Sequence, residues 1–490
     1  MQLSKFLTKS RYLDGLHCPK YLWMEFNTPA DIPEKDAVTL YLLEQGNRVC
    51  RIAQKAYPDG LNASKNPDGS FKYIEEVIGK GCVLFEANIS KDSLFARADI
   101  LVPAGNNSWD LIEVKSSTSI KDYHINDITF QKHCCDIAGL KVNRCFIQCV
   151  NKEYVKKSEI DPGAFFCKED VTAKVNEVLK AEIANIDNAL KIVIDDKCPQ
   201  TPVGRKCKSN TYGDECPLRE TCLTALPENN VFDLYRGGQK SEDLFNSGIL
   251  AIKDIPETTK LTANQKVQWK CACSNSSYID SRAIKGFMDG LKYPLYFFDF
   301  ETINPCIPLF DNTSPYEYLP FQYSLHVVND VNAKVRHYSF IADGTKDPRE
   351  KLLLSLKSKM GPEGSIIVYH KSFEEGRLKE LADKFPKEAN WINGLISRLV
   401  DLEDPFKSFH YYHSKQRGSA SLKKVLPVLT SKNYNGLNID RGDQASIIYL
   451  DIIEKRITNE KKMQALEDLE KYCSLDTEGM IEIINVLKRS

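Results

Sequence analysis

The sequence predicts an α/β protein with more than one domain. Short apolar segments that contain β-branched and aromatic residues alternate with segments whose apolar residues recur at helical spacing. Of the 490 residues, 42% are hydrophobic and 27% are charged, which is typical of globular domains and excludes a disordered or collagen-like chain. At about 150 residues per domain, the length suggests roughly three domains.

Composition also restricts the class of protein. No uncharged apolar run approaches the roughly 18 residues that cross a bilayer, and the N-terminal segment lacks the apolar core of a secretory signal. We therefore expect a cytoplasmic protein without membrane contact, whose 16 cysteines are free thiols or metal ligands. The net charge of −1 offers no global basic surface for nucleic acid, although bound cations would change the field locally.

The N-terminal half is predicted to form one domain, residues 1–228. Residues 1–60 are expected to be mostly helical, and the helical pattern ends at the turn signal of residues 57–60. Strands are then predicted at residues 82–85, 94–96, 111–114 and 142–150, with helices over 126–138 and 170–195. A polar helical linker is expected over residues 229–288.

The C-terminal part is predicted to form a second α/β domain, residues 289–490. Residues 295–298 are expected to be a buried strand, with hairpin neighbours at 323–328 and 335–341. A further buried strand over 366–369 precedes a helix over 374–385, and the last helix is predicted over 461–487.

Asp99, Glu113 and Lys115 form the first candidate site. An aspartate follows an apolar-flanked strand, and Glu-x-Lys stands on the next strand, where side-chain alternation puts Glu113 and Lys115 on one face. Two carboxylates suit Mg²⁺ or Mn²⁺ beside a phosphodiester, and a nearby lysine can orient the attacking water or neutralise developing charge. We interpret this pattern as a nuclease site, with a solvated strand face as the alternative.

The same segment resembles the PD-(D/E)xK motif of RecB-like nucleases. Residues 116–118 and Gln131 on the following helix fit the resemblance, which implies a restriction-endonuclease-like fold and nucleic-acid contact by Gln131. The class often carries a tyrosine four residues after the glutamine, where this chain has Cys135. Glu44 occupies the place where such enzymes add a metal ligand, and Glu86 is a further candidate; a surface glutamate is the alternative for both.

Four cysteines form the second candidate site: Cys18, Cys207, Cys216 and Cys222. One N-terminal cysteine with three after the catalytic segment resembles the cage of iron–sulfur RecB-like exonucleases, which implies a 4Fe–4S cluster. Four thiolates suit such a cluster, and Zn²⁺ is the alternative. Eight residues separate the first two distal cysteines where the family commonly has two, so Cys198 is a possible substitute. The other cysteines are expected to need no special chemistry.

Asp299, Glu301, Glu374, Tyr472 and Asp476 form the third candidate site. Asp299 and Glu301 stand one residue apart at the expected end of a buried strand, which is costly by charge repulsion unless cations bind there. Glu374 follows another buried strand, and Tyr472 and Asp476 share one face of the last helix. Acidic helix ends and solvated faces are the alternative interpretation.

This order resembles the DEDD exonucleases of the ribonuclease H-like fold. The resemblance implies that the four carboxylates bind two metal ions, Mg²⁺ or Mn²⁺, and that Tyr472 orients the nucleophilic water. Glu374 stands where the family has aspartate. Asp401, after another short apolar segment, is expected to be structural.

Nearly the whole chain is similar to an uncharacterised bacterial family that joins a RecB-like region to a C-terminal domain related to ribonuclease H. The similarity lies in residues 298–302, 319–326, 421–427 and 472–477. It implies a metal-dependent nuclease, favoured as a 3′–5′ exonuclease on DNA with a second RecB-like site, in repair or defence. An RNA exonuclease and a catalytically degenerate nucleic-acid-binding scaffold are the alternatives.

Overall fold

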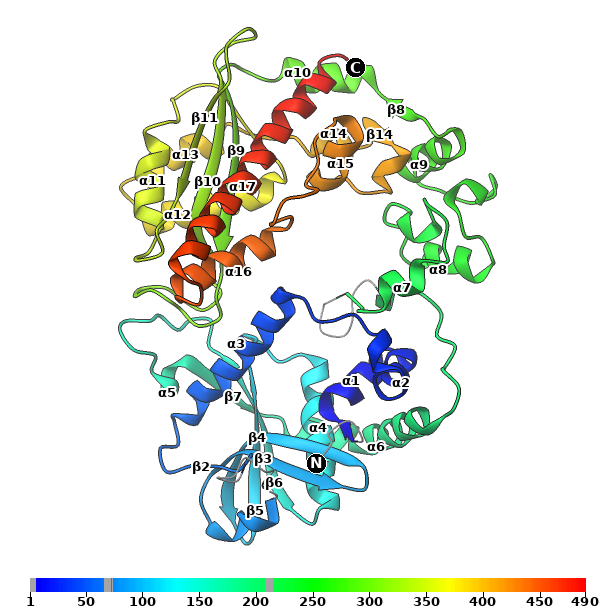
Figure 1. Ribbon diagram of the computed structural model, residues 1–490, viewed down its shortest axis with the longest axis vertical. Coiled ribbons are helices and arrows are strands. Elements are labelled where there is room, and N and C mark those ends of the chain that lie inside the picture. Colours follow the sequence, from blue (N-terminus) through cyan, green and yellow to red (C-terminus); the bar gives the residue numbers. More distant parts are fainter. Residues whose placement is uncertain (1–5, 66–71, 73, 208–214) are drawn as a thin grey trace. The chain divides into compact units, whose positions relative to one another are not determined.

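The computed structural model describes residues 6–65, 72, 74–207 and 215–490, and it divides into two compact units (Figure 1). Unit 1 comprises Met1–Thr224 and Pro305–Glu317, and unit 2 comprises Ala225–Asn304 and Tyr318–Ser490. Both contain a β-sheet with helices, so the predicted α/β class is confirmed. The expected linker, residues 229–288, lies within unit 2 instead of between domains. Among the described helices, none combines the length and apolar character needed to cross a bilayer.

Unit 1 is built on a seven-stranded sheet. Strands β2 to β7 follow one another in chain order and β1 pairs with β4. Their bounds are β1 (Leu7–Thr8), β2 (Leu61–Asn62), β3 (Leu84–Lys91), β4 (Leu94–Gly105), β5 (Ser108–Lys115), β6 (Lys141–Val150) and β7 (Phe166–Asp170). Asn106 and Asn107, both at positive φ, form the tight turn between β4 and β5. β5 and β6 run parallel, and the helix α4 crosses between them.

Helices pack on both faces of this sheet. Their bounds are α1 (Lys9–His17), α2 (Pro19–Asn27), α3 (Ala37–Gln54), α4 (Asp122–Ile137), α5 (Pro162–Phe165), α6 (Thr172–Ile194) and α7 (Arg219–Leu223). Leu111 of β5 belongs to the core formed with α1, α4 and α6, whereas Ile112 and Val114 belong to the core formed with α3. This alternation directs Glu113 toward the side of α1 and α4.

Unit 2 is built on a five-stranded sheet with the order β11-β10-β9-β12-β13. The bounds are β9 (Leu295–Ile303), β10 (Leu319–Val328), β11 (Arg336–Ile341), β12 (Ser365–Val368) and β13 (Leu399–Asp401). β10 runs antiparallel to both β11 and β9, and β12 runs parallel to both β9 and β13. β12 pairs with β9 only as far as Phe297, so the second half of β9 extends beyond β12.

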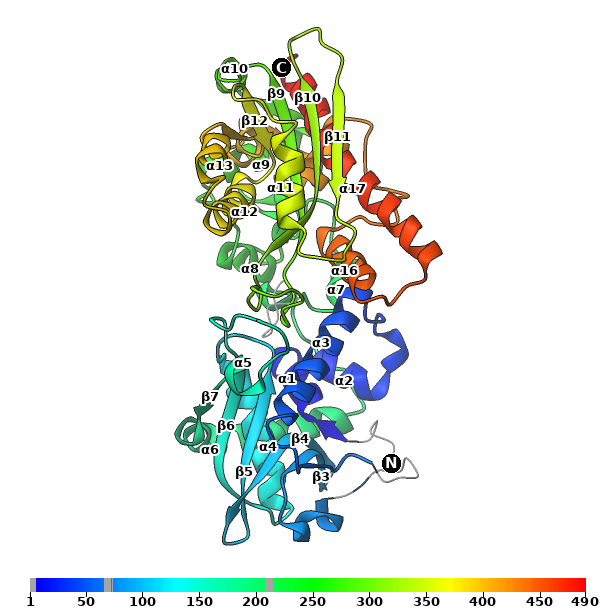
Figure 2. The same ribbon diagram turned by 90° about the vertical axis from the view of Figure 1, so that its left-hand side faces the viewer.

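Two groups of helices cover the faces of this sheet, as Figure 2 shows. One group packs with the apolar residues Tyr296, Phe298 and Phe300 of β9: α11 (Arg349–Lys357), α12 (Lys371–Lys384) and α13 (Ala389–Ile396). The other group is α16 (Gly442–Ile453) and α17 (Asn459–Leu487), which contact β9, and α15 (Leu422–Leu429) packs against α17. Side chains of β9 that alternate with the aromatic residues therefore face α16 and α17.

The segment expected as a linker adds smaller elements to unit 2. These are α8 (Gln239–Asn246), α9 (Ala263–Ser274), β8 (Ser277–Ile279) and α10 (Ser281–Asp289). β8 pairs with β14 (Tyr411–His413), which follows α14 (Asp404–Lys407). Arg417 also forms an ion pair with Asp233 at 2.9 Å. Gly418 has a φ of +72°, and an added Cβ would come within 2.2 Å of the Asp233 carbonyl oxygen, so only glycine fits this contact.

Candidate functional site

The carboxylates of unit 2 start on the central strand β9. Asp299 and Glu301 lie inside this strand, which continues to Ile303, and not at its end as the sequence predicts. The difference arises because Asp299 and Glu301 stay paired with β10 after the pairing with β12 has ended. Both side chains therefore point to the face covered by α16 and α17, where one edge of β9 lacks a neighbouring strand.

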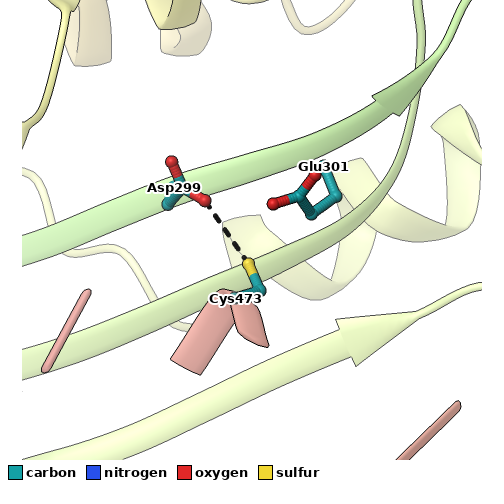
Figure 3. A group of neighbouring side chains, drawn as sticks. All are labelled: Asp299, Glu301 and Cys473. Carbon is teal, nitrogen blue, oxygen red and sulfur yellow. Dashed lines mark hydrogen bonds between the residues drawn. The ribbon is translucent and has the colours of Figure 1, made fainter. Parts of the chain in front are cut away.

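Cys473 of α17 joins these two carboxylates, as Figure 3 shows. One ligand atom from each of Asp299, Glu301 and Cys473 lies within 4.8 Å of the others. The Cys473 thiol donates to Asp299 Oδ2 at 3.5 Å and is fully buried. Cys473 was not among the site residues predicted from the sequence; its position one residue after Tyr472 was the available signal.

Glu374 and Asp476 complete a group of four carboxylates. Glu374, in the first turn of α12, is 2% exposed, and Asp476 of α17 is 7% exposed. Burial, followed by the charge of Asp299, raises the pKa of Glu374 well above its ordinary value. Burial also raises the pKa of Asp476 to about 6, although a hydrogen bond from Tyr434 and the charge of Lys423 act to lower it. The structure thus brings all four predicted carboxylates of this site into one electrostatic neighbourhood.

Two tyrosines and a lysine line the same group. Tyr472, which the sequence predicts, is buried, and its ring lies 6.1 Å from that of Tyr434. Tyr434 donates a hydrogen bond to Asp476 Oδ1. Lys423 lies over both rings. Sequence reasoning missed both residues. Tyr434 lies between α15 and α16, in a segment without a periodic pattern that would place it here, and Lys423 is the second residue of α15, whose packing against α17 the sequence does not show.

The residues of this group fit a divalent cation. Glu374 Oε2 is buried without a hydrogen-bond partner, and no described lysine or arginine forms an ion pair with any of the four carboxylates. Burial and the charges of Asp299 and Asp476 also raise the pKa of Glu301 well above its ordinary value. Buried carboxylates so close together need cations or protons, and oxygen-rich sets of this kind suit Mg²⁺ or Mn²⁺. Asp401 accepts hydrogen bonds from backbone N–H groups at the start of α12, a structural role.

The predicted residues of unit 1 also lie together. Glu113 is 1% exposed and accepts hydrogen bonds from Lys115 at 2.7 Å and from Gln131 at 2.6 Å. Asp99 accepts a hydrogen bond from the Val114 backbone N–H at 2.8 Å. Lys9, which sequence reasoning missed, donates to Glu113 Oε1 at 2.6 Å from the first turn of α1.

Charge at this second group is compensated internally. Burial would raise the pKa of Glu113, but the charges of Lys115 and Lys9 and their hydrogen bonds hold it well below its ordinary value. Asp127, which sequence reasoning also missed, forms ion pairs with both lysines. Burial, followed by the charge of Glu113, raises the pKa of Asp99 to about 8. The oxygens of Glu113 are thus already bonded to ammonium and amide groups, and this group fits a divalent cation poorly while Lys9 is in place.

Neither additional glutamate is shown to be a ligand. Glu44 is exposed on α3, whose buried face consists of Tyr41, Gln45, Val49 and Ala53. Glu86 is half-buried, and it accepts a hydrogen bond from Gln54 at 3.4 Å. Burial raises the pKa of Glu86, and the nearby charge of Glu113 adds to this effect. Glu86 therefore lies near the carboxylate group of unit 1.

The four predicted cage cysteines gather around α2. Cys216, with Tyr21, Met24 and Leu218, forms a small core against which Cys18, Cys207 and Cys222 pack. Cys18 is the N-cap residue of α2. Lys20 Nζ also lies 3.5 Å from Cys222 Sγ. Four thiols are the donor set that a metal cluster or Zn²⁺ would need. Residues 208–214, between Cys207 and Cys216, lie outside the described residues.

Cys198 and Cys135 have other surroundings. The Cys198 thiol contacts the carbonyl oxygen of its neighbour Pro199 at 3.9 Å. Cys135 is fully buried in the main core of unit 1. Cys135 thus acts as a small apolar residue there.

The chain is similar to known proteins, but none of the following matches carries an assigned activity. Residues 296–421 match a family described as a domain of unknown function, DUF2779. The chain is similar to uncharacterized protein MG366 of Mycoplasma genitalium, with 28% identity over 231 residues, or 43% of this chain and 34% of the relative. It is also similar to uncharacterized protein UU173 of Ureaplasma parvum, with 29% identity over 343 residues, or 64% of this chain and 48% of the relative. The chain thus spans between a third and half of the length of these relatives.

Proposed function

We propose that this protein is a metal-dependent nuclease and that unit 2 carries its hydrolytic site, acting as a 3′–5′ exonuclease on DNA. The observation that carries the proposal is the convergence of four carboxylates from β9, α12 and α17, of which Asp299 is half-buried and the other three are buried. Among the described residues, no lysine or arginine forms an ion pair with them. Their order along the chain supports a DEDD-type site on a ribonuclease H-like unit. The family that matches residues 296–421 has no assigned activity, so the proposal rests on the side chains of the site.

The side chains of unit 2 would divide the work of phosphodiester hydrolysis. Divalent cations, when bound, supply charge neutralisation and an acidified water. Asp299, Glu301, Glu374 and Asp476 are the residues that would hold them, and Tyr434 fixes the orientation of Asp476. The hydroxyl of Tyr472, on the same helix face as Asp476, would orient the nucleophile. The buried surroundings exclude bulk water, which strengthens each of these interactions.

A weaker form of the proposal concerns unit 1. Asp99, Glu113, Lys115 and Gln131 lie together as a RecB-like PD-(D/E)xK site requires, which supports a second nuclease centre. Lys9 and Lys115 already form ion pairs with Glu113, so this carboxylate has no open position for a cation. Activity in unit 1 would require Lys9 to leave this carboxylate.

The cysteine cage of unit 1 is proposed to hold a 4Fe–4S cluster, with Zn²⁺ as the alternative. Cys18 directly follows α1 and caps α2, so a cluster would tie these helices to the segment that carries Cys216 and Cys222. A brown preparation that absorbs near ~400 nm is expected for the cluster. A colourless protein that contains one Zn²⁺ per chain would assign zinc instead.

The proposed function is tested with labelled substrates. The 490-residue chain with Mn²⁺ is expected to shorten 5′-labelled single-stranded DNA progressively from its 3′ end. Asp299→Asn should reduce the rate about a hundredfold or more, because the carboxylate charge that holds the cation is lost. Asp289→Asn, at an exposed ion pair with Lys285, is the matched control and should keep the rate. Intact DNA at protein concentrations that bind it would overturn the enzyme proposal in favour of a binding scaffold.

Two further measurements in this assay distinguish DNA from RNA as the substrate and show which unit carries the hydrolytic site. A labelled RNA of the same sequence measures the alternative substrate, and faster RNA hydrolysis would replace DNA in the proposal. Glu113→Gln is expected to leave 3′–5′ shortening in place, because Glu113 belongs to unit 1. Loss of activity in Glu113→Gln, with activity kept in Asp299→Asn, would move the hydrolytic site to unit 1.

A further inference from the structure

Lys423 lies beside the carboxylates of unit 2 without pairing with them. It is the second residue of α15 and is half-buried. Its Nζ lies over two aromatic rings, 5.2 Å from the centre of the Tyr472 ring and 5.5 Å from the centre of the Tyr434 ring. Cation–π attraction of this kind holds an ammonium group in place and leaves its N–H donors available.

The donors of Lys423 differ from those of the lysines in unit 1. Lys9 and Lys115 each donate to Glu113, at 2.6 and 2.7 Å. Within the described part of the chain, Lys423 makes neither a hydrogen bond nor an ion pair. An ammonium group carries three donors, so a half-buried one at a candidate site can accept a ligand with oxygen atoms.

The surroundings of Lys423 select the chemistry of that ligand. Burial and like charges raise the pKa of Asp299 and Glu301, and the positive charge of Lys423 acts in the opposite direction on both. The ammonium group therefore lies close enough to interact electrostatically with the carboxylates, although it forms no hydrogen bond with them. A group bound between Lys423 and cations held by the carboxylates would meet positive charge on both sides. A phosphate of a polynucleotide has this charge and offers two non-bridging oxygens.

We propose that Lys423 binds a non-bridging oxygen of the phosphate at the 3′-terminal phosphodiester of single-stranded nucleic acid. This inference rests on the proposed function and adds the residue that holds the substrate. Tyr434 and Tyr472 form the platform for the ammonium, and Tyr434 also donates to Asp476, which links the platform to the carboxylates. The lysine would thus neutralise part of the substrate charge beside the carboxylates.

Equilibrium binding of modified DNA tests this contact. Fluorescence anisotropy is measured in Ca²⁺ with a single-stranded oligonucleotide and with the same oligonucleotide carrying an uncharged methylphosphonate at its 3′-terminal linkage. The wild-type 490-residue chain and Lys423→Met are compared, with Lys423→Arg as the conservative variant and Lys424→Met as the control. Lys424 is the exposed neighbour on the same helix.

The expected results form a double-mutant cycle. Lys423→Met should weaken binding of unmodified DNA about tenfold, the value of one charge-assisted hydrogen bond, and Lys423→Arg and Lys424→Met should stay within about threefold. The methylphosphonate should weaken binding to wild type by about the same factor and have little effect on Lys423→Met. The slope of log affinity against log salt should fall by about 0.7 in Lys423→Met, as expected for one lost phosphate contact.

Different failures separate this inference from the proposed function. Equal methylphosphonate penalties in wild type and Lys423→Met would overturn the Lys423 contact and leave the nuclease proposal standing. Mn²⁺ binding by Lys423→Met must also match that of wild type within about threefold, and its loss would show that Lys423 only supports the carboxylate group. A wild-type protein that binds neither Mn²⁺ nor DNA would overturn both proposals.

Discussion

Unit 1 and unit 2 each bury carboxylates on a central strand, but they balance the charge in different ways. In unit 1, Glu113 is bonded to two lysines and to Gln131. In unit 2, Asp299 and Glu301 have a thiol and other carboxylates as neighbours, and Glu374 has a buried oxygen without a partner. A buried charge without a partner of opposite charge is expensive. The carboxylates of unit 2 therefore need cations or protons from outside, whereas Glu113 of unit 1 already has its partners.

The difference in charge balance indicates which of the two carboxylate groups would need an external cation. Unit 1 supplies its own positive charge, because Lys9 and Lys115 lie within 2.7 Å of Glu113. Unit 2 places Lys423 over aromatic rings instead and leaves the carboxylates to external cations or protons. The carboxylate groups of units 1 and 2 therefore differ in how easily a metal ion could bind, although their residue types are similar. Substitutions should accordingly act with opposite signs on stability.

The largest effect is expected for Glu113→Gln. Loss of this carboxylate leaves the ammonium groups of Lys9 and Lys115 without their main partner, and breaking a buried pair costs about 3–5 kcal/mol of unfolding free energy. Urea denaturation measures the loss. Asp136→Asn is the matched control, because it breaks only the partly exposed pair with Lys132 and should cost less than about 1 kcal/mol. Equal costs for the two variants would show that Glu113 is not the centre of charge compensation.

The pH dependence of unit 2 comes next. The folded pKa of Asp476, about 6, lies above the ordinary value of about 3.9 for an unfolded chain. The folded state therefore binds more protons, and its contribution to stability is present below about pH 4 and lost as pH rises through about 6. The difference in unfolding free energy between wild type and Asp476→Asn, measured in a chelator, should change by about 2–3 kcal/mol across this range. A constant difference would contradict the raised pKa.

A smaller effect of opposite sign to that of Glu113→Gln is expected for Asp299→Asn. Removing one charge from the crowded group relieves repulsion, so the metal-free variant should be more stable than wild type by about 1 kcal/mol. Addition of Mn²⁺ should raise the thermal midpoint of wild type and leave that of Asp299→Asn unchanged. A destabilised Asp299→Asn that still gains stability from Mn²⁺ would remove the contrast between the units.

The smallest effect is expected for Lys9→Met. Without this ammonium, Glu113 keeps only Lys115 and Gln131 as bonded partners, and a divalent cation gains access to Glu113 and Asp99. Weak Mn²⁺ binding at unit 1 should therefore tighten by up to about fivefold, as expected for the loss of one competing ion pair worth up to about 1 kcal/mol. Isothermal titration in an Asp299→Asn background isolates this site. Unchanged weak binding would show that Lys9 does not block the carboxylates.

Sequence patterns predicted the residues that share one element. Alternation on β5 placed Glu113 and Lys115 on one face, and helical spacing placed Tyr472 and Asp476 together on α17. The strand end at Asp299 was wrong, because pairing with β10 continues to Ile303 and keeps these polar residues in the sheet. Local patterns cannot show such tertiary pairing.

Partners from distant segments could not be predicted. Lys9 reaches Glu113 across 104 positions of the chain, and this contact depends on how α1 packs against α4. Tyr434 lies on an irregular segment and reaches Asp476 only after α15 and α17 have packed together. The four cysteines that the resemblance to iron–sulfur RecB-like exonucleases suggested lie in one small core of unit 1, and their role as metal ligands stays a prediction.

The most direct test of the account is the number of Mn²⁺ ions that bind tightly, measured by the electron paramagnetic resonance signal of free Mn²⁺ at pH 7.5. Wild type and Glu113→Gln are expected to bind tightly to the same extent, and Asp299→Asn should lose this binding. This outcome would assign the metal requirement to the uncompensated carboxylates of unit 2. Tight binding that survives in Asp299→Asn and disappears in Glu113→Gln would contradict the account.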